Sequence, residues 1–240
     1  MIRNEYSKEL ISSLSGPIIG FIGATMPEIG YDREFTKSIG YELRGNTHSK
    51  GGTLFTGGVC GVGLHAYRGI AKYCIDNNLK DDGFFVMIPK NVHVPRIDAF
   101  GIPDYNDIRV VPYSPPKRYE SYAEMISENG LKVITAGEDM AGRRDILART
   151  GDIFVMINGG LGTLEESFFA LDGGKQVITM PDTGGTARLL ADIAQGACLD
   201  LTYLHRRGID PPNLTEDKRK QILIATDAKQ VIDFIDGIGK

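Results

Sequence analysis

The chain passes from an expected strand into an expected helix at Asn158-Gly159-Gly160-Leu161-Gly162-Thr163-Leu164-Glu165-Glu166. An apolar run at 152–157 precedes this stretch and predicts a buried strand, whereas residues 164–171 predict a helix. Three glycines and a threonine therefore lie where the helix begins. The first turn of a helix offers unpaired N–H groups and the positive end of its dipole, and glycine lets a phosphate approach the backbone closely. The stretch thus predicts a phosphate-binding turn.

Two side chains of the same stretch carry the expected chemistry. Thr163 is placed to cap the helix or to donate a hydrogen bond to a phosphate oxygen. Glu166 lies one turn inside the helix, so its carboxylate can face the same cleft. A phosphate site with a carboxylate beside it favours an enzyme that acts on a phosphorylated substrate. The alternative is that Glu166 is an exposed helix residue, since the adjacent Glu165 shows that acids suit this turn.

The rest of the chain alternates apolar strands with helices. Strands are predicted at 17–22, 52–55, 83–88, 108–111, 132–135, 152–157, 176–180 and 221–225, and helices at 32–44, 62–77, 119–129, 141–148, 164–171, 186–196 and 228–235. Residues 1–15 are expected to form an amphipathic helix or arm, and residues 90–119 an irregular excursion over the sheet. The alternation predicts an α/β fold with a doubly wound, mostly parallel sheet, Rossmann-like and built in three α/β/α layers. We expect a single domain over residues 1–240.

Four of the predicted strands end in glycine or small polar residues. These ends are Gly23-Ala24-Thr25, Thr56-Gly57-Gly58, Gly159-Gly160-Leu161-Gly162-Thr163 and Thr183-Gly184-Gly185. The carboxyl ends of the strands of an open α/β sheet form one edge, and ligands bind there. The geometry of short connections explains any one of these turns, but the four together favour a nucleotide-type site.

Composition and charge exclude several classes of function. The 240 residues carry a net charge of −4 without a dominant basic patch, so nucleic acid is not an expected partner. The three cysteines form no CxxC pair and the four histidines match no metal spacing, so neither a metal nor a redox cofactor is expected. The chain opens without an apolar signal core and has no apolar run of membrane-spanning length. We therefore expect a cytoplasmic protein without a membrane partner.

The common nucleotide and hydrolase motifs are absent. The glycines at 20–23 and 58–63 lack the GxGxxG spacing of a dinucleotide fold, and no GxxxxGK[ST] sequence marks a phosphate-binding P-loop. The GxSxG turn of many hydrolases is also missing. If the predicted turn binds a phosphate, it therefore does so in a protein of a different class from these.

Two motifs together resemble the LOG (Lonely Guy) family of cytokinin-activating phosphoribohydrolases, within the SLOG-type Rossmann superfamily. They are Met140-Ala141-Gly142-Arg143-Arg144 and Asn158-Gly159-Gly160-Leu161-Gly162-Thr163-Leu164-Glu165-Glu166, which are similar to the family patterns M-H-x-R-K and P-G-G-x-G-T-x-x-E. The spacing between them fits the family without a gap. The turns Gly23-Ala24-Thr25 and Gly57-Gly58-Val59-Cys60-Gly61-Val62-Gly63 resemble further family turns, so the similarity covers roughly residues 17–195.

The resemblance implies a specific reaction. Members of the family cleave the N-glycosidic bond of a nucleoside 5′-monophosphate and release the free base and ribose 5-phosphate. It implies Arg143 and Glu166 as the catalytic pair, with Met140, Arg144 and Asn158 joining the glycine turns in substrate binding. A carboxylate near the ribose would stabilise the positive charge that develops during this cleavage. Both catalytic side chains are expected on helix faces toward the cleft, so their removal should affect folding little; the alternative is a solvated arginine face.

Departures from the family pattern keep a second function open. Asn158 stands for the family's proline, Ala141 for its histidine and Arg144 for its lysine. The wider superfamily includes nucleotide-sensing domains and molybdenum-cofactor carriers, which share the scaffold without one common activity. The expected partner is therefore a nucleoside monophosphate or a related phosphorylated small molecule, and the alternative is a non-catalytic binding protein.

Two further expectations concern assembly and a possible cover of the site. The resemblance implies a homodimer or larger oligomer, and the helix predicted at 62–77 supports it because its apolar residues extend over more than one stripe. The competing explanation is that this helix is covered within its own chain. Tyr105, Tyr113, Tyr119 and Tyr122 could stack on a base, although tyrosines that pack loops are commoner.

Overall fold

The protein is represented by a computed structural model. It describes residues 3–5, 14, 16–27, 30–57, 60–79, 83–97, 103–112, 132–197, 201–206, 209 and 214–237. No helix of these residues is long and apolar enough to cross a membrane.

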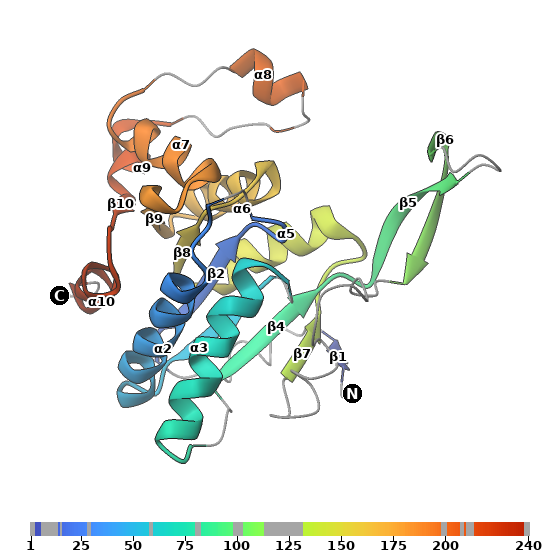
Figure 1. The fold of residues 1–240 in the computed structure, drawn as a ribbon. Helices are drawn as coiled ribbons and strands as arrows, with labels where there is room; N and C mark the ends of the chain where they lie inside the picture. Colours follow the sequence, from blue (N-terminus) through green and yellow to red (C-terminus); the bar gives the residue numbers. More distant parts are fainter. Residues whose placement is uncertain are drawn as a thin grey trace.

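The centre of the molecule is one eight-stranded sheet (Figure 1). Its strands, in spatial order, are β1 (Arg3–Glu5), β7 (Lys132–Thr135), β4 (Phe84–Ile88), β3 (Thr53–Thr56), β2 (Ile18–Gly23), β8 (Ile153–Ile157), β9 (Gln176–Met180) and β10 (Ile222–Ile224). Every neighbouring pair runs parallel. Parallel strands need crossover helices, which explains the alternation seen in the sequence. The predicted doubly wound α/β architecture is confirmed.

Helices cover both faces of this sheet. One face carries α2 (Arg33–Ser49), α3 (Val62–Asp76) and α10 (Ala228–Gly237), and the other carries α5 (Met140–Thr150), α6 (Leu161–Asp172) and α7 (Gly185–Ala194). The shorter helical segments are η1 (Pro181–Thr183), α8 (Leu201–Arg206) and α9 (Glu216–Lys220). The molecule is therefore built in the three layers that the sequence predicts.

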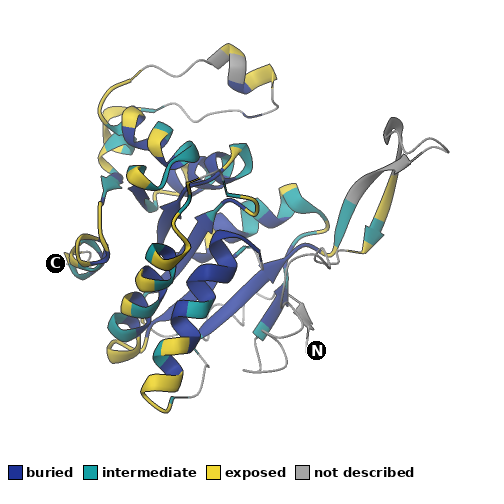
Figure 2. Cartoon of the chain, in the orientation of Figure 1, coloured by how far each residue is buried: buried dark blue, intermediate teal, exposed yellow. Residues whose placement is uncertain are grey.

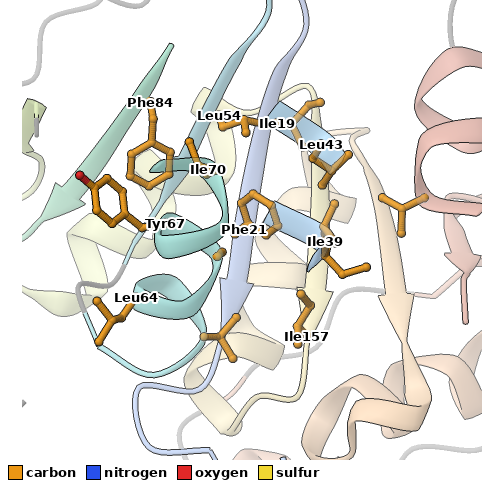
Figure 3. Close-up of a cluster of buried hydrophobic side chains, with 14 of the residues drawn as sticks. Ile19, Phe21, Ile39, Leu43, Leu54, Leu64, Tyr67, Ile70, Phe84 and Ile157 are labelled. Atoms are coloured by element: carbon orange, nitrogen blue, oxygen red, sulfur yellow. The ribbon is translucent and has the colours of Figure 1, made fainter. Parts of the chain in front are cut away.

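Each face of the sheet has its own hydrophobic core. On β2, Ile19 and Phe21 point into the core beneath α2 and α3, whereas Ile18 and Ile22 belong to the core beneath α5 and α6 (Figure 3). This alternation follows from the two-residue period of a strand. Burial is nearly complete along the central strands, while the outward sides of the helices are exposed (Figure 2). A sheet apolar on both faces is typical of parallel α/β proteins.

The strand β2 is the point where the order of the sheet reverses. The chain runs from β2 outward through β3 and β4 on one side, and it returns to β8 on the other side. Asp152 fixes this return, since its Oδ2 accepts a hydrogen bond from the backbone N–H of Ile18 at 3.0 Å. Helices that leave β2 and β8 pass to opposite faces, so a crevice opens between the two strand ends.

Helices α2 and α3 pack against each other at two glycines. A side chain at Gly40 would collide with the carbonyl oxygen of Ala66, and one at Gly69 would collide with the carbonyl oxygen of Lys37. The close approach lets α2 lie directly beside α3 on the same face of the sheet. Most apolar residues of α3 are thus buried within the chain, with Ile75 exposed, so the breadth of this apolar surface is explained without an oligomer.

Two parts of the predicted secondary structure are wrong. Arg3–Glu5 forms a short edge strand paired with β7, where a helix or arm was expected. Residues expected to be irregular, apart from a strand at 108–111, form an antiparallel hairpin of β5 (Asn91–Ile97) and β6 (Pro103–Pro112), which projects from the body in Figure 1 and contains the predicted strand within β6. Three prolines disguise this hairpin, but proline is tolerated in a ribbon whose strands are both edges. The helix expected at 119–129 lies outside the described residues.

Candidate functional site

A cavity of about 300 Å³ lies at the carboxyl ends of β2 and β8. Five segments form it: the end of β2 with the turn after it, the end of β3, the start of α3, the first turns of α5, and the turn between β8 and α6 with the start of α6. The predicted site residues that line it are Gly23, Ala24, Thr25, Thr56, Gly57, Met140, Arg143, Arg144, Asn158, Gly159, Gly160, Gly162, Thr163 and Glu166. The chain therefore brings three of the four predicted turns together at the reversal point of the sheet.

Some predicted residues lie elsewhere, and some lining residues were missed. Leu161, Thr183, Gly184 and Gly185 do not line the cavity, and Gly58 lies outside the described residues. The missed residues are Phe21, Ile22, Met26, Cys60 and Gly63. Phe21 and Ile22 belong to a strand that its apolar pattern assigns wholly to the core. Cys60 and Gly63 lie in the glycine-rich turn that the family resemblance had already pointed out.

The turn from β8 into α6 has an unusual backbone. Asn158 has a φ of 54° and Gly159 a φ of 112°, both in the left-handed region. Asparagine tolerates this region better than most residues, whereas proline is fixed near −65°. The family's proline therefore cannot adopt the backbone conformation that Asn158 has here. Gly160 is the N-cap and α6 begins at Leu161, so Thr163 lies within the first turn and the prediction that it caps the helix is wrong.

The segment after β9 supports this turn from behind. The backbone N–H of Asn158 donates to Thr183 Oγ1 at 2.6 Å, and Asn158 Nδ2 donates to the Thr183 carbonyl at 2.7 Å. The backbone N–H groups of Thr186 and Ala187 donate to the carbonyls of Gly159 and Asn158. The residues at 183–185, which were predicted to bind substrate, therefore lie outside the cavity lining. Thr183 instead supports the turn that does line the cavity.

A buried ion pair lies in the wall of the cavity. Arg143 Nη2 donates to Glu166 Oε1 at 2.6 Å, and both side chains are 7% exposed. Arg143 Nη1 also donates to the carbonyl oxygen of Gly57. One guanidinium thus joins α5, α6 and the end of β3. Neither the solvated arginine face nor the exposed Glu166 considered from the sequence is present.

Burial controls the protonation of Glu166. Desolvation raises the pKa of its carboxyl above the ordinary value of 4.5, and the nearby charges of Arg143 and Arg144 oppose the shift without reversing it. A charged carboxylate loses more hydration on burial than its neutral form does. The pKa of Glu166 is therefore shifted from its ordinary value in the direction of neutral pH.

A second ion pair lies beside the first and is partly open to solvent. Arg144 Nη1 donates to Glu165 Oε2 at 2.6 Å, with side chains 26% and 19% exposed. The guanidinium of Arg144 lies close over the first turn of α6, because a side chain at Gly162 would come within 2.7 Å of its Nη2. A side chain at Gly160 would meet only open space. The positive end of α6 and a cation thus share one side of the cavity.

Other titratable groups take no part in the two ion pairs, although Cys60 lines the cavity. His65 packs against Tyr31, with Nδ1 3.2 Å from the phenol oxygen, and burial followed by Arg33 and Arg68 lowers its pKa to about 4. Burial raises the pKa of the Cys60 thiol. No group of three or more His, Cys, Asp or Glu side chains in the described part of the chain could hold a metal ion. Tyr113, Tyr119 and Tyr122 lie outside the described residues, and Tyr105 lies in β6.

Comparison with known proteins agrees with this arrangement. Residues 110–200, which include both arginine–glutamate pairs, match the SLOG cluster4 family. The fold of the whole chain is Rossmann-like, as in the solved structures that resemble it. The SLOG-type expectation from the sequence is confirmed. No curated protein matches the chain.

Solved structures resemble this protein over nearly their full length. TM1055, a structural-genomics target, has a TM-score of 0.54 at 20% identity and covers 92% of this chain and 99% of its own. A molybdenum cofactor binding protein from Rippkaea orientalis has a TM-score of 0.51 at 21% identity, covering 95% and 100%. The molybdenum cofactor carrier protein from Chlamydomonas reinhardtii has a TM-score of 0.50 at 17% identity, covering 92% and 97%. At these identities the similarity concerns the fold.

Proposed function

We propose that this SLOG protein is a phosphoribohydrolase that cleaves a nucleoside 5′-monophosphate into free base and ribose 5-phosphate. The observation that carries the proposal is the buried Arg143–Glu166 pair in the wall of a cavity that also contains the first turn of α6. The carboxylate of Glu166 can stabilise a cationic transition state, and the first turn of α6 can bind a phosphate. Their combination fits an N-glycosidic bond next to a 5′-phosphate.

The phosphate would bind at the start of α6. The open space at Gly160 admits an anion to the backbone, and the guanidinium of Arg144 lies over the same turn at Gly162. A helix N-terminus stabilises a bound phosphate through its N–H groups and its dipole. The 300 Å³ cavity is at the small end for ligand sites, which suits a mononucleotide.

Glu166 would act on the ribose. As the bond from C1′ to the base breaks, the electron pair leaves with the base and positive charge develops on the ribose. The carboxylate of Glu166 stabilises that charge and accepts a proton from the water that adds to C1′. The departing base nitrogen takes up a proton from solvent, and Glu166 returns its proton to solvent, so that the net reaction adds one water across the bond. A base whose pKa has been moved toward neutral pH is better matched to this proton transfer.

Arg143 would hold Glu166 in place. Its two terminal nitrogens are already engaged by Glu166 and by the Gly57 carbonyl. The guanidinium therefore fixes the carboxylate relative to the end of β3 and to α6. Contact with the phosphate is left to Arg144.

Turnover of a panel of monophosphates tests the proposal. Wild-type protein is incubated with AMP, GMP, CMP and modified AMPs, and ribose 5-phosphate is measured. We expect release from at least one, with a loss of about 10²–10⁴-fold in Glu166→Gln, since a general base contributes on that scale. Asp145→Asn serves as a control, because Asp145 pairs with Arg149 on the exposed side of α5. Lack of turnover by wild type, or full activity of Glu166→Gln, would refute the assignment.

A second candidate is a binding protein that retains its ligand unchanged. The bonds of both terminal nitrogens of Arg143 to Glu166 and Gly57 favour it, because they tie this guanidinium to the protein and not to a substrate. The molybdenum cofactor proteins named above share only the fold. Mass spectrometry of the protein as purified decides between the two: an intact phosphorylated pterin or nucleotide in equal amount with the protein supports binding without turnover.

Assembly as a homo-oligomer is also proposed, on the family resemblance alone. The chain mass is 26.2 kDa, so light scattering of a dimer would give about twice that value. A monomer mass at micromolar concentration would reject this part of the proposal.

A further inference from the structure

The two arginine–glutamate pairs between α5 and α6 differ in their surroundings. Arg143 and Glu166 are buried together and both line the cavity. In the second pair, Arg144 lines the cavity but Glu165 does not. Glu165 is therefore placed to act on Arg144 from behind, without facing a ligand itself.

The second pair sets where the cation of Arg144 lies. Glu165 Oε2 accepts a hydrogen bond from Arg144 Nη1, and the other terminal nitrogen of Arg144 lies over Gly162 in the first turn of α6. The Nε of Arg144 is buried and has no acceptor in the described part of the chain. The hydrogen bond to Glu165 therefore fixes one end of the guanidinium and keeps the group next to the first turn of α6.

An ordinary surface ion pair would not have this effect. The Asp145–Arg149 pair on the same helix is 44% and 73% exposed, and such pairs contribute little. The Arg144–Glu165 pair is less than one-third exposed and joins two helices instead of one turn of a single helix. An arginine side chain otherwise has many rotamers, so ordering it before a ligand arrives removes part of the entropy lost on binding.

We propose that Glu165 is a positioning residue: it holds Arg144 over the first turn of α6, where the guanidinium meets the phosphate of the ligand. The proposal rests on the phosphate site of the proposed function, and it does not depend on turnover. Glu165 thereby determines the preference of the cavity for a phosphorylated ligand over the corresponding neutral one.

Binding of AMP and of adenosine to five proteins tests the proposal by calorimetry. The proteins are wild type, Arg144→Ala, Glu165→Ala, the double variant and Glu165→Gln. We expect each single alanine variant to weaken AMP binding about tenfold or more, as loss of a charge-assisted contact does, and to leave adenosine binding within about twofold. Glu165→Gln should recover part of the affinity, because its amide oxygen can still accept from Arg144.

The double variant separates positioning from a merely structural role. If Glu165 acts through Arg144, removing it in addition to Arg144 has no further effect on AMP affinity. Additive losses, equal losses for AMP and adenosine, or an unchanged Glu165→Ala would each overturn the proposal. Asp145→Ala, which breaks the exposed pair on α5, should bind AMP as wild type does.

The same measurements separate this inference from the proposed reaction. If wild type binds AMP more tightly than adenosine but releases no ribose 5-phosphate, the proposed hydrolase activity is refuted. The affinities of the variants then still test the role of Glu165. Wild type that binds AMP no better than adenosine overturns the role of Glu165, whatever its turnover.

Discussion

Arg143 Nη2 lies 2.6 Å from Glu166 Oε1, and the two side chains meet from different helices with only 7% of each exposed. Burial of both charges changes what their removal should do. A charge left without its partner in such a place is far more costly than one at the surface. The expectation from the sequence that loss of Arg143 or Glu166 affects folding little is therefore replaced by the opposite one.

Removal of either partner should destabilise the protein. Arg143→Ala leaves a buried carboxylate and Glu166→Ala leaves a buried guanidinium, so each should lower the free energy of unfolding by about 3–5 kcal/mol. Urea denaturation monitored by circular dichroism measures the change. The double variant Arg143→Met/Glu166→Leu should regain much of the loss, because neither charge remains. For comparison, Arg149→Ala breaks an exposed pair and should change stability by about 1 kcal/mol or less.

The stability of the protein should depend on pH through Glu166. Its folded-state pKa is raised above 4.5, so its contribution to stability is complete below that value and is lost as pH rises through the folded-state pKa. Glu166→Gln does not titrate at this position. The free energy of unfolding of wild type should therefore fall relative to that of Glu166→Gln as pH increases over this range. A difference that rises with pH would show that the Arg143 charge outweighs burial.

Two neighbouring glycines should respond oppositely to substitution by alanine. Gly160→Ala adds a methyl group in open space at the cavity, so folding should change by about 1 kcal/mol or less while AMP binding weakens. Gly159 has a φ of 112°, and its added methyl would press on Thr163 and Thr186, so Gly159→Ala should lower the melting temperature clearly. Thermal melting and calorimetry on both variants make the comparison. Undiminished AMP affinity in Gly160→Ala would place the phosphate elsewhere.

Substitution of Asn158 by the family's proline should damage the protein. Proline cannot adopt a φ of 54°, and it lacks the N–H that donates to Thr183 Oγ1. Asn158→Gly keeps the backbone conformation and loses only the side-chain bond to the Thr183 carbonyl, so it should be much closer to wild type. The melting temperatures of the two variants check this order. A stable Asn158→Pro would mean that the turn readily adopts a second conformation.

The sequence predicts the sheet well because its strands are apolar on both faces and end at glycines. The strands at 132–135 and 176–180 are found with the predicted bounds. Only the 108–111 part of the hairpin β5–β6 was predicted, because the pairing of the hairpin depends on contacts across the ribbon, which a local pattern interrupted by prolines does not reveal. The edge strand β1 is too short to show a period at all.

The predicted site residues lie together where motif and strand end coincide. Arg143 and Glu166 lie 23 residues apart, and nothing local in the sequence specifies that they pair. The resemblance supplied that pair, whereas the residues themselves placed only Glu166 at the cleft and left a solvated arginine face as the alternative. Thr183–Gly185 were assigned to the cavity because they follow a strand, but β9 lies one strand beyond the reversal point, and the residues after it support the turn at Asn158.

The position of the cavity beside the β2–β8 contact has a consequence for the order in which the molecule can be made. The bond from Ile18 to Asp152 joins residues 134 apart in sequence, and the cavity forms at the other end of the same two strands. Contacts of such long range form late, because the entropy of closing a large loop has to be overcome first. A chain leaving the ribosome presents β2, β3 and α3 long before α6 has been synthesised. A chain that ends before α6 lacks part of the cavity lining, so occupancy of the cavity by the proposed ligand would report that β2 and β8 have joined.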